Sequence, residues 1–295
     1  MAKIVSFINY KGGVGKTTLA VEIAASLAYH HGQKVLLVDL DPQTNATFYL
    51  MQEKDWDNWQ KSKGSLKNLF DSYIEGRSFD IKTAIKKDFI IAPRTGRTVS
   101  LHLLPSHISL LTIDLKLAGR FGAEGTKGKG ALLKVFEQIK NEYDFIICDC
   151  PPSLNLITQN AIISSNGIVI VAVPEFLSTL GIALIQSTIK DTIKEVNDDL
   201  SSFGAKGIEA PKIIGIIFNR VKYVTHGTTY QQEVMNRMKE EYPGMVFQSY
   251  VSESGKIAER GEDKIPIAIS GYARDKNYEM QLYDCAKEFI RRTLI

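Results

Sequence analysis

The chain has 295 residues, of which 44% are hydrophobic and 23% are charged, as in ordinary globular proteins that bury a core. Its formal net charge of +3 is too small to indicate nucleic-acid binding by itself. No apolar run approaches the ~18 residues of a membrane span, and three cysteines do not make a disulfide framework. Because residues 1–3 lead into an apolar run without the layout of a signal peptide, we expect a cytoplasmic protein.

A glycine-rich stretch near the N-terminus carries the clearest chemical signal. It follows an apolar run, residues 4–8, which predicts a strand, and it precedes apolar residues at helical spacing. Its members are Lys11, Gly12, Gly13, Val14, Gly15, Lys16, Thr17 and Thr18. A strand, a glycine loop and a helix in this order are typical of a loop that binds phosphate groups.

The residue types in this loop suit a nucleotide for physical reasons. Glycines let backbone N–H groups turn around an anion without an obstructing Cβ, and the start of a helix attracts the same anion. Lys16 can bridge terminal phosphate oxygens, and the Thr17 hydroxyl can hold Mg²⁺. The usual P-loop spacing is not met, because Tyr10 stands at its first glycine position and Lys11 opens the loop instead.

The pattern Lys-Gly-Gly-x-Gly-Lys-Thr-Thr resembles the deviant Walker A motif of the ParA/MinD family of dimeric ATPases. The resemblance implies that Lys11 reaches across a dimer interface to the partner's nucleotide, while Lys16 contacts the nucleotide of its own subunit. It also implies ATP and Mg²⁺ as cofactors and a homodimer bridged by ATP. A glycine-rich turn with two solvated lysines is the structural alternative.

Two aspartates follow a second apolar run, residues 35–39, which predicts a buried strand. Polar residues at the carboxyl end of such a strand lie where α/β sheets bind ligands. The family resemblance makes this the switch I region, where Asp41 supports attack of water on the γ-phosphate and Asp39 lies near Mg²⁺ through water. Either aspartate could instead cap a helix or form a turn before Pro42.

Two further strand ends carry candidate site residues. Residues 145–149 read as a Walker B strand whose Asp149 would hold a water molecule bound to Mg²⁺. In the family, the prolines that follow begin the switch II loop. Asn219 ends a later strand, and it matches the asparagine that contacts adenine in the family, although asparagine is also a common turn residue.

These patterns predict an α/β fold with a doubly wound, mostly parallel sheet, of the deviant P-loop NTPase class. We expect one domain over residues 1–295. The remaining strands are expected at 100–106, 168–174, 213–219 and, as a short late strand, 246–251. Helices after the first are expected at 110–117, 131–140, 179–200 and 278–294.

Three segments are less regular in sequence. Residues 46–98 are expected to form an elaboration at the sheet edge, in which Trp56 and Trp59 pack locally rather than bind a ligand. Residues 119–130, with five glycines, are expected to form a mobile loop. Cys148 and Cys150 are expected to point to opposite faces of their strand, which argues against a shared metal site.

The resemblance implies an ATPase for DNA partition, in plasmid or chromosome segregation. Its ATP-bound dimer would bind nonspecific DNA, associate with the nucleoid, and be released when a ParB-like adaptor stimulates hydrolysis. Tyr250 and Val251 stand where chromosomal relatives carry an arginine for DNA. A displaced basic patch could be formed by Arg220, Lys222, Lys256, Arg260, Lys264 and Arg274.

Two alternatives share the same nucleotide chemistry. One is a MinD-like ATPase on a membrane surface, and the other is a ParA-like ATPase that positions a protein cargo. The last predicted helix mixes acidic and basic residues, which fits a docked helix better than a membrane anchor. The loop motif does not separate DNA partition from protein positioning.

Overall fold

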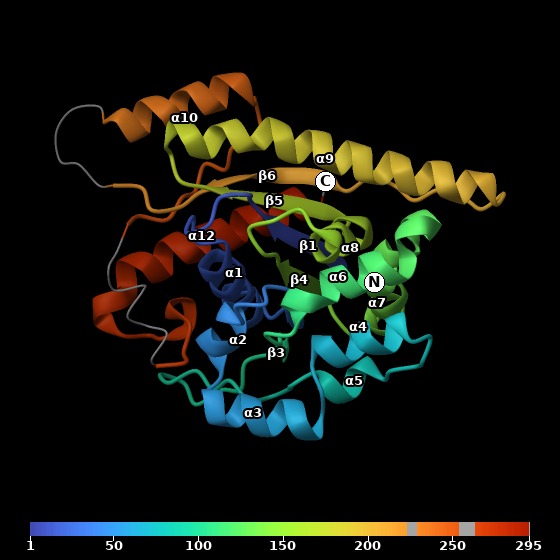
Figure 1. The fold of residues 1–295 in the computed structure, drawn as a ribbon. Helices are drawn as coiled ribbons and strands as arrows, with labels where there is room; N and C mark the ends of the chain where they lie inside the picture. The colour runs from blue at the N-terminus through green and yellow to red at the C-terminus, as the bar shows by residue number, and fades with distance from the viewer. Residues whose placement is uncertain (223–228, 254–262, 295) are drawn as a thin grey trace.

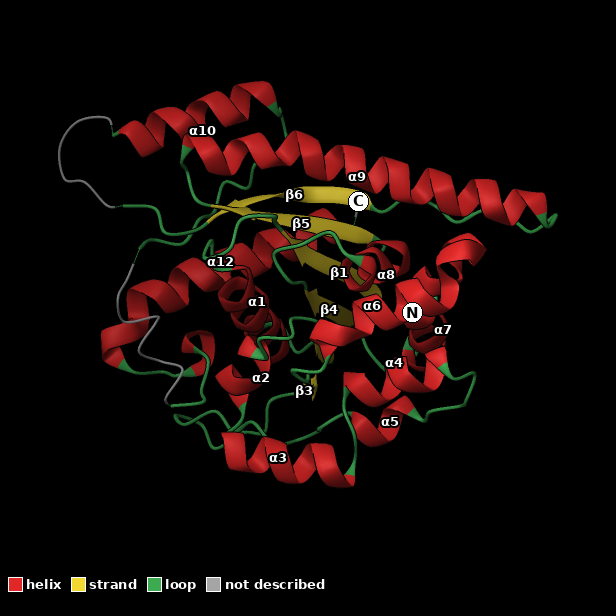
Figure 2. Ribbon diagram, viewed as in Figure 1, coloured by secondary structure: helices red, strands yellow, loops and turns green. Residues whose placement is uncertain are grey.

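The computed structural model describes residues 1–222, 229–253 and 263–294, with the backbone alone described at 123–125 and 176–180. Its centre is a six-stranded sheet with the strand order β3-β2-β4-β1-β5-β6 (Figures 1 and 2). Every neighbouring pair is parallel, which confirms the predicted fold class. The strands are β1 (Lys3–Ile8), β2 (Val35–Asp39), β3 (Leu101–Leu104), β4 (Phe145–Asp149), β5 (Gly167–Ala172) and β6 (Lys212–Phe218).

Helices cover both faces of the sheet and bury two layers of hydrophobic core (Figure 2). One face packs against α1 (Lys16–His30), α2 (Asn45–Leu50), η3 (Ile267–Ile269) and α12 (Lys276–Thr293). The other packs against α4 (Leu66–Ile74), α5 (Ile81–Ala84), α6 (Leu110–Phe121), α7 (Ala131–Ile139), α8 (Leu156–Ser164), α9 (Phe176–Ser202) and α10 (Tyr230–Glu241). No helix in the described part of the chain is long and apolar enough to cross a membrane.

The central strands are buried on both faces, which explains their continuous apolar sequences. All six residues of β5, Gly-Ile-Val-Ile-Val-Ala, are buried, as are all five of β2 and β4. Branched side chains suit such strands because both sides of the pleat contact helices. The polar residues that end these strands are therefore all brought to one edge of the sheet, where parallel strands place their carboxyl ends.

Residues 46–98 lie beside β3, which is the edge strand. This segment contains α2, α3 (Glu53–Ser62), α4 and α5. The backbone N–H of Lys86 donates to the Leu103 carbonyl at 2.8 Å, and the reverse bond measures 2.9 Å, so the segment covers the open edge. Trp56 and Trp59 donate their indole N–H groups to the carbonyls of Ser106 and Ala84, which indicates a packing role.

The expectation of a loop at 119–130 was wrong, because α6 continues to Phe121 and a 3₁₀ helix follows, η1 (Gly122–Lys129). Two side chains from other elements hold this helix through its carbonyl groups. The Tyr73 hydroxyl donates to the Lys127 carbonyl at 2.6 Å, and the Asn160 amide donates to the Gly128 carbonyl at 2.8 Å.

The strand expected at 246–251 is also absent, and only isolated bridges join Val246 and Ser252 to the β6 side of the sheet. Phe247 and Val251 donate to β6, but between them a side chain takes two backbone donors and interrupts the pairing. The carboxylate of Glu288 accepts the N–H groups of Gln248 and Ser249, each at 3.0 Å.

The expectation that the two cysteines beside Asp149 point to opposite faces of the strand was wrong. Cys148 and Cys150 both belong to the same core layer and are buried. Residues two apart on an extended chain share a face, so the expectation misapplied the strand period. Among the described residues, no group of three or more histidine, cysteine, aspartate or glutamate side chains has the arrangement of a metal site.

Candidate nucleotide site

The loop that follows β1 and the polar ends of β2 and β4 meet at one edge of the sheet. A cavity of about 560 Å³ opens there. Most of the predicted residues line it, namely Gly12, Gly13, Gly15, Lys16, Thr17, Thr18 and Asp41. Further lining residues were not assigned to the site from sequence, namely Gln43, Asn45, Phe48, Tyr49, Pro152 and Lys264. The volume suits a ligand of nucleotide size.

The backbone of the loop requires glycine at two positions. Gly13 and Gly15 have φ of 75° and 87°, in the left-handed region that side chains rarely adopt. At Gly15 a Cβ would also lie 2.0 Å from the amide nitrogen of Asn219. Helix α1 begins directly afterwards at Lys16, so its positive end faces the cavity.

Lys16 is nearly buried at the base of this loop, with 6% of its surface exposed. Its ammonium group donates to the Lys11 carbonyl at 3.3 Å, which is a long hydrogen bond. Burial lowers the pKa of Lys16, although the nearby charges of Asp149 and Asp41 favour the protonated form. A buried ammonium group with only a long hydrogen bond would be strongly stabilised by a charge-assisted hydrogen bond to a phosphate group.

Asp39 is committed to holding the chain that follows β2. One carboxylate oxygen accepts both the N–H and the hydroxyl of Thr47 at 2.7 Å, and the other accepts the Asp41 N–H at 3.2 Å. Burial raises the pKa of Asp39 to about 7 in spite of these hydrogen bonds. The contacts describe a residue that fixes the switch I loop, and any contact with Mg²⁺ stays a proposal.

Asp149 differs from Asp39 in its surroundings. Its two carboxylate oxygens are buried, and neither has a hydrogen-bond partner among the described residues. Burial and the neighbouring charge of Asp39 raise the pKa of Asp149 well above its usual value, while the Thr17 hydroxyl acts in the opposite direction. A buried carboxylate without partners, beside a threonine hydroxyl, fits a hydrated divalent cation such as Mg²⁺.

Asp41 faces the cavity from a tightly bonded turn. Its carboxylate accepts the Gln43 N–H at 2.9 Å, and its carbonyl accepts the Ser106 hydroxyl at 2.7 Å. The turn ends at Thr44, whose φ is 57°, immediately before α2. These bonds fix the backbone on both sides of the carboxylate, as the positioning of a water molecule would require.

Asn219 and Arg220 brace the glycine loop from the end of β6. The Asn219 amide donates to the Val14 carbonyl at 3.0 Å. The Arg220 guanidinium donates to the Gly13 carbonyl at 3.1 Å and pairs with Glu253 at 3.2 Å. Sequence reasoning had assigned Arg220 to a DNA patch, because its contact with the loop depends on chain folding and not on a local motif.

Lys11 does not line the cavity that Lys16 lines. Its ammonium group lies 2.9 Å from a Glu175 carboxylate oxygen of the same chain, and 41% of the side chain is exposed. Its backbone N–H donates to the Asn9 side chain at 2.9 Å. Lys11 thus lies at the molecular surface. Its predicted contact with the nucleotide of a second subunit stays a prediction.

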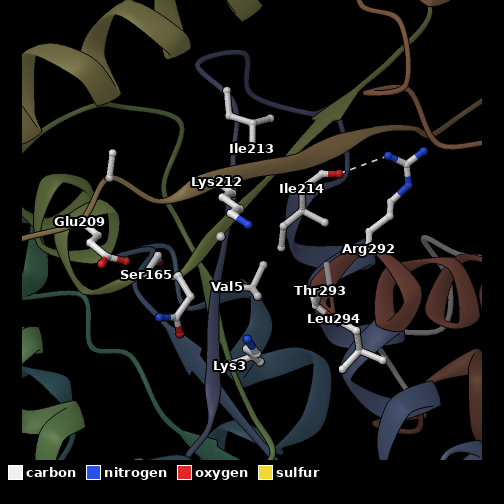
Figure 3. A pocket seen from close by; sticks show the side chains of 13 residues that line it. Lys3, Val5, Ser165, Glu209, Lys212, Ile213, Ile214, Arg292, Thr293 and Leu294 are labelled. Carbon is white, nitrogen blue, oxygen red and sulfur yellow. Dashed lines mark hydrogen bonds between the residues drawn. The ribbon is translucent and has the colours of Figure 1, made fainter.

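A second cavity, of about 460 Å³, lies at the amino ends of β1, β5 and β6 (Figure 3). It is lined by Lys3, Lys212 and Arg292 among others, and it is therefore at the opposite edge of the sheet. The Arg292 guanidinium already donates to the carbonyls of Ile214 and Val246 at 3.2 and 2.9 Å. We assign the nucleotide to the first cavity, where the phosphate-binding loop lies.

Comparison with known proteins decides the family. A family model described as an AAA domain matches residues 2–202. The sporulation initiation inhibitor protein Soj of Bacillus subtilis is 30% identical over 290 residues, which are 98% of each chain. The chain belongs to the ParA/MinD family of P-loop ATPases.

Two further likenesses agree with this assignment. The chromosome-partitioning ATPase Soj of Treponema pallidum is 30% identical over 268 residues, which cover 91% of this chain and 90% of that protein. An ATP complex of a McdA variant from Cyanothece superposes with a TM-score of 0.72, at 20% identity and with 98% and 96% of the two chains covered. The latter supports the fold.

Proposed function

We propose that the protein is an ATP-dependent, dimerising ATPase for DNA partition, in plasmid or chromosome segregation, which hydrolyses ATP with Mg²⁺. The observation that carries the proposal is that Lys16 and Asp41 line one cavity at the start of α1, with the buried Asp149 close enough to Lys16 for their charges to interact. A buried cation and a buried carboxylate without hydrogen bonds are costly in an empty fold, and a nucleotide with its metal ion compensates both. The relationship to the chromosome-partitioning ATPase Soj supports the biological setting.

Each site residue has a separate task in the proposed reaction. The glycine loop and Lys16 bind the phosphates, and Thr17 with Asp149 would hold Mg²⁺, which neutralises phosphate charge when bound. Asp41 orients the attacking water, since its carboxylate is fixed by the Gln43 N–H. Asn219 would contact the adenine edge from the end of β6.

The dimer is proposed to form around ATP, with Lys11 of each subunit completing the other's site. Lys11 is suited to this because it lies at the surface beside the nucleotide loop. A positive charge that arrives only in the dimer would stabilise the transition state without tightening ATP binding to the monomer. Slow turnover by the isolated protein follows, because hydrolysis would wait for assembly and for a ParB-like adaptor.

The ATP-bound dimer is proposed to bind nonspecific DNA and so to associate with the nucleoid in the cytoplasm. The candidate patch is weaker than its sequence suggests, because Arg220, Lys264 and Arg274 each have a partner within the chain. Lys222 is exposed, and Lys256 and Arg260 lie outside the described residues. DNA affinity should therefore be modest and should fall with salt.

The decisive experiment measures binding to a nonspecific DNA duplex with ADP or with a slowly hydrolysed ATP analogue, at two salt concentrations. Sedimentation of the same samples reports the oligomeric state. Binding that requires the ATP analogue, appears with the dimer and weakens with salt would support the proposal. A dimer without DNA binding would favour a protein cargo, whereas flotation with anionic liposomes in ATP would favour the membrane alternative.

A further inference from the structure

Helix α2 begins where the switch I turn ends, and it is held from the far C-terminal part of the chain. Residues 263–269, here called the clamp segment, lie beside α1 and precede α12 (Figure 1). The ammonium group of Lys264 donates to the Phe48 carbonyl of α2 at 2.6 Å. This is a short, charge-assisted hydrogen bond to one of the carbonyls that a helix end leaves without an internal partner.

A second connection joins the same elements through a buried carboxylate on α1. Glu22 accepts the Tyr49 hydroxyl of α2 at 2.6 Å. It also accepts the N–H groups of Ile267 and Ala268, at 2.9 and 2.8 Å. Neighbouring residues of α2 are therefore bonded to the clamp segment, one directly and one through α1.

The start of α2 is bonded to the nucleotide site itself. Thr47 donates its N–H and hydroxyl to Asp39, at the end of β2. Asp41 lies between that aspartate and the helix, in the turn that faces the cavity. Displacement of α2 would consequently move the turn that carries Asp41.

Two properties of Lys264 suggest more than a role in packing, namely its position in the lining of the cavity and its backbone conformation. It lines the nucleotide cavity together with the glycine loop, so its charge adds to that of Lys16. Its φ is 55°, which is unfavourable for a residue with a Cβ and which marks a backbone that the surrounding contacts must maintain. Residue 264 also lies beyond the 2–202 region that the family model matches.

We infer that Lys264 is a positioning residue of the nucleotide site, which holds α2 against the bound nucleoside triphosphate and contributes positive charge to the cavity. The clamp segment thereby becomes part of the nucleotide site. The inference rests on the proposed function for the identity of the ligand. It gives Lys264 a task that does not involve DNA, in contrast to the basic patch considered from sequence.

The test is calorimetric titration of the full chain with Mg²⁺ and a slowly hydrolysed ATP analogue, in the absence of DNA. Lys264→Met removes both the charge and the hydrogen bond, and it should weaken binding by about tenfold. Lys264→Arg retains a cationic donor and should bind within about threefold of the unmodified protein. Lys276→Met, which removes an exposed lysine at the start of α12, is the matched control and should bind normally.

A second readout follows α2 directly. The ring of Trp56 packs at 5.4 Å from that of Phe48, so in a Trp59→Phe background its fluorescence reports on α2. Lys264→Met should shift this fluorescence and reduce its response to the nucleotide, because the hydrogen bond that holds α2 is lost. Unaltered affinity in Lys264→Met would overturn the inference. Absence of nucleotide binding by the unmodified chain would instead overturn the proposed function on which it rests.

Discussion

The ammonium group of Lys11 lies 2.9 Å from a carboxylate oxygen of Glu175 in the same chain. The lysine that is proposed to act on a second subunit is thus paired within its own subunit in the monomer. Both side chains are about half exposed, at 41% and 51%, so water screens the pair. Such exposed ion pairs contribute roughly 0.2–1 kcal/mol.

Replacement of Glu175 should therefore release Lys11 at small cost. We expect Glu175→Gln to tighten ATP-dependent dimerisation by up to about fivefold, the size of one exposed ion pair. Analytical ultracentrifugation with a slowly hydrolysed ATP analogue measures the change. Lys11→Ala should still bind nucleotide but lose turnover, and it should abolish any effect of the Glu175 substitution. Equal dimerisation of Glu175→Gln and the unmodified protein would show that the pair does not restrain Lys11.

Removal of the Lys16 ammonium group should abolish nucleotide binding. The ammonium group of Lys16 is buried in the loop and makes only a long hydrogen bond of 3.3 Å among the described residues, to the Lys11 carbonyl, so the phosphate would be its main partner. Calorimetry with Lys16→Ala and ATP should detect no binding at concentrations that saturate the unmodified protein. Near-normal affinity would show that this loop does not bind the phosphates of ATP.

Substitution of Asp41 should abolish ATP hydrolysis and leave ATP binding intact. Loss of a group that positions water costs about 10²–10⁴-fold in rate, so Asp41→Ala should bind ATP and accumulate as an ATP-bound dimer. Asp41→Asn keeps an acceptor for the Gln43 N–H and should show the same loss, which excludes collapse of the turn as its cause. Rapid phosphate release by both variants would contradict the assigned role.

Substitution of Asp149 by asparagine should stabilise the fold and abolish the activity. Its carboxylate is buried without hydrogen bonds and close to Asp39, which favours a neutral side chain in the absence of metal. Asp149→Asn should therefore raise the free energy of unfolding in chelator, while Mg²⁺-dependent ATP hydrolysis is lost. Urea unfolding and a phosphate-release assay measure the two effects. Lower stability would mean that this carboxylate serves the fold.

Glu22 makes stability depend on pH. Burial raises its pKa to about 7, against an ordinary value of 4.5, while hydrogen bonds from Tyr49, Ala268 and Ile267 act in the opposite direction and Asp275 adds to the rise. Between pH 4.5 and 7 the folded protein thus holds a proton that the unfolded chain releases. The stability contributed by Glu22 is complete below about pH 4.5 and is lost as the pH rises through 7.

The measurement compares urea unfolding of the unmodified protein and Glu22→Gln at pH 5 and pH 8. The difference in stability between the two proteins should shift by about 2–3 kcal/mol in favour of Glu22→Gln at the higher pH. Using the difference cancels the other titrating groups that both proteins share. A constant difference across this range would show that Glu22 keeps an ordinary pKa.

The sequence predicted those features that depend on local pattern. The glycine loop, the strand that ends at Asp149 and the parallel, doubly wound sheet all follow from short motifs and apolar runs. The packing of Asn219 against Gly15 could not be read locally, since it joins the end of β6 to the first loop. The same holds for Lys264, which reaches α2 from 216 positions away in the chain.

The mistaken segments have specific physical causes. Residues 246–251 look like a strand, but a distant carboxylate, Glu288, accepts the N–H groups of Gln248 and Ser249 and interrupts the pairing with β6 between Phe247 and Val251. The glycines at 119–130 suggested a loop, but the hydroxyl of Tyr73 and the amide of Asn160 stabilise a 3₁₀ helix. Local propensity was overridden in both places by side chains from other elements.

The parallel sheet also constrains how the chain is made. Its central strand β1 is synthesised first, yet it pairs with β4 from Phe145 onward and with β5 from Gly167 onward. Parallel pairing across so many residues is slow, because a long loop must close before any contact forms. The phosphate-binding loop therefore leaves the ribosome before the strands β4 and β5 that flank β1, and it gains its final surroundings only after they have paired. Nascent chains that end before β4 hold the apolar strand β1 without either of its neighbours in the sheet, and exposed apolar strands of this kind are prone to aggregation.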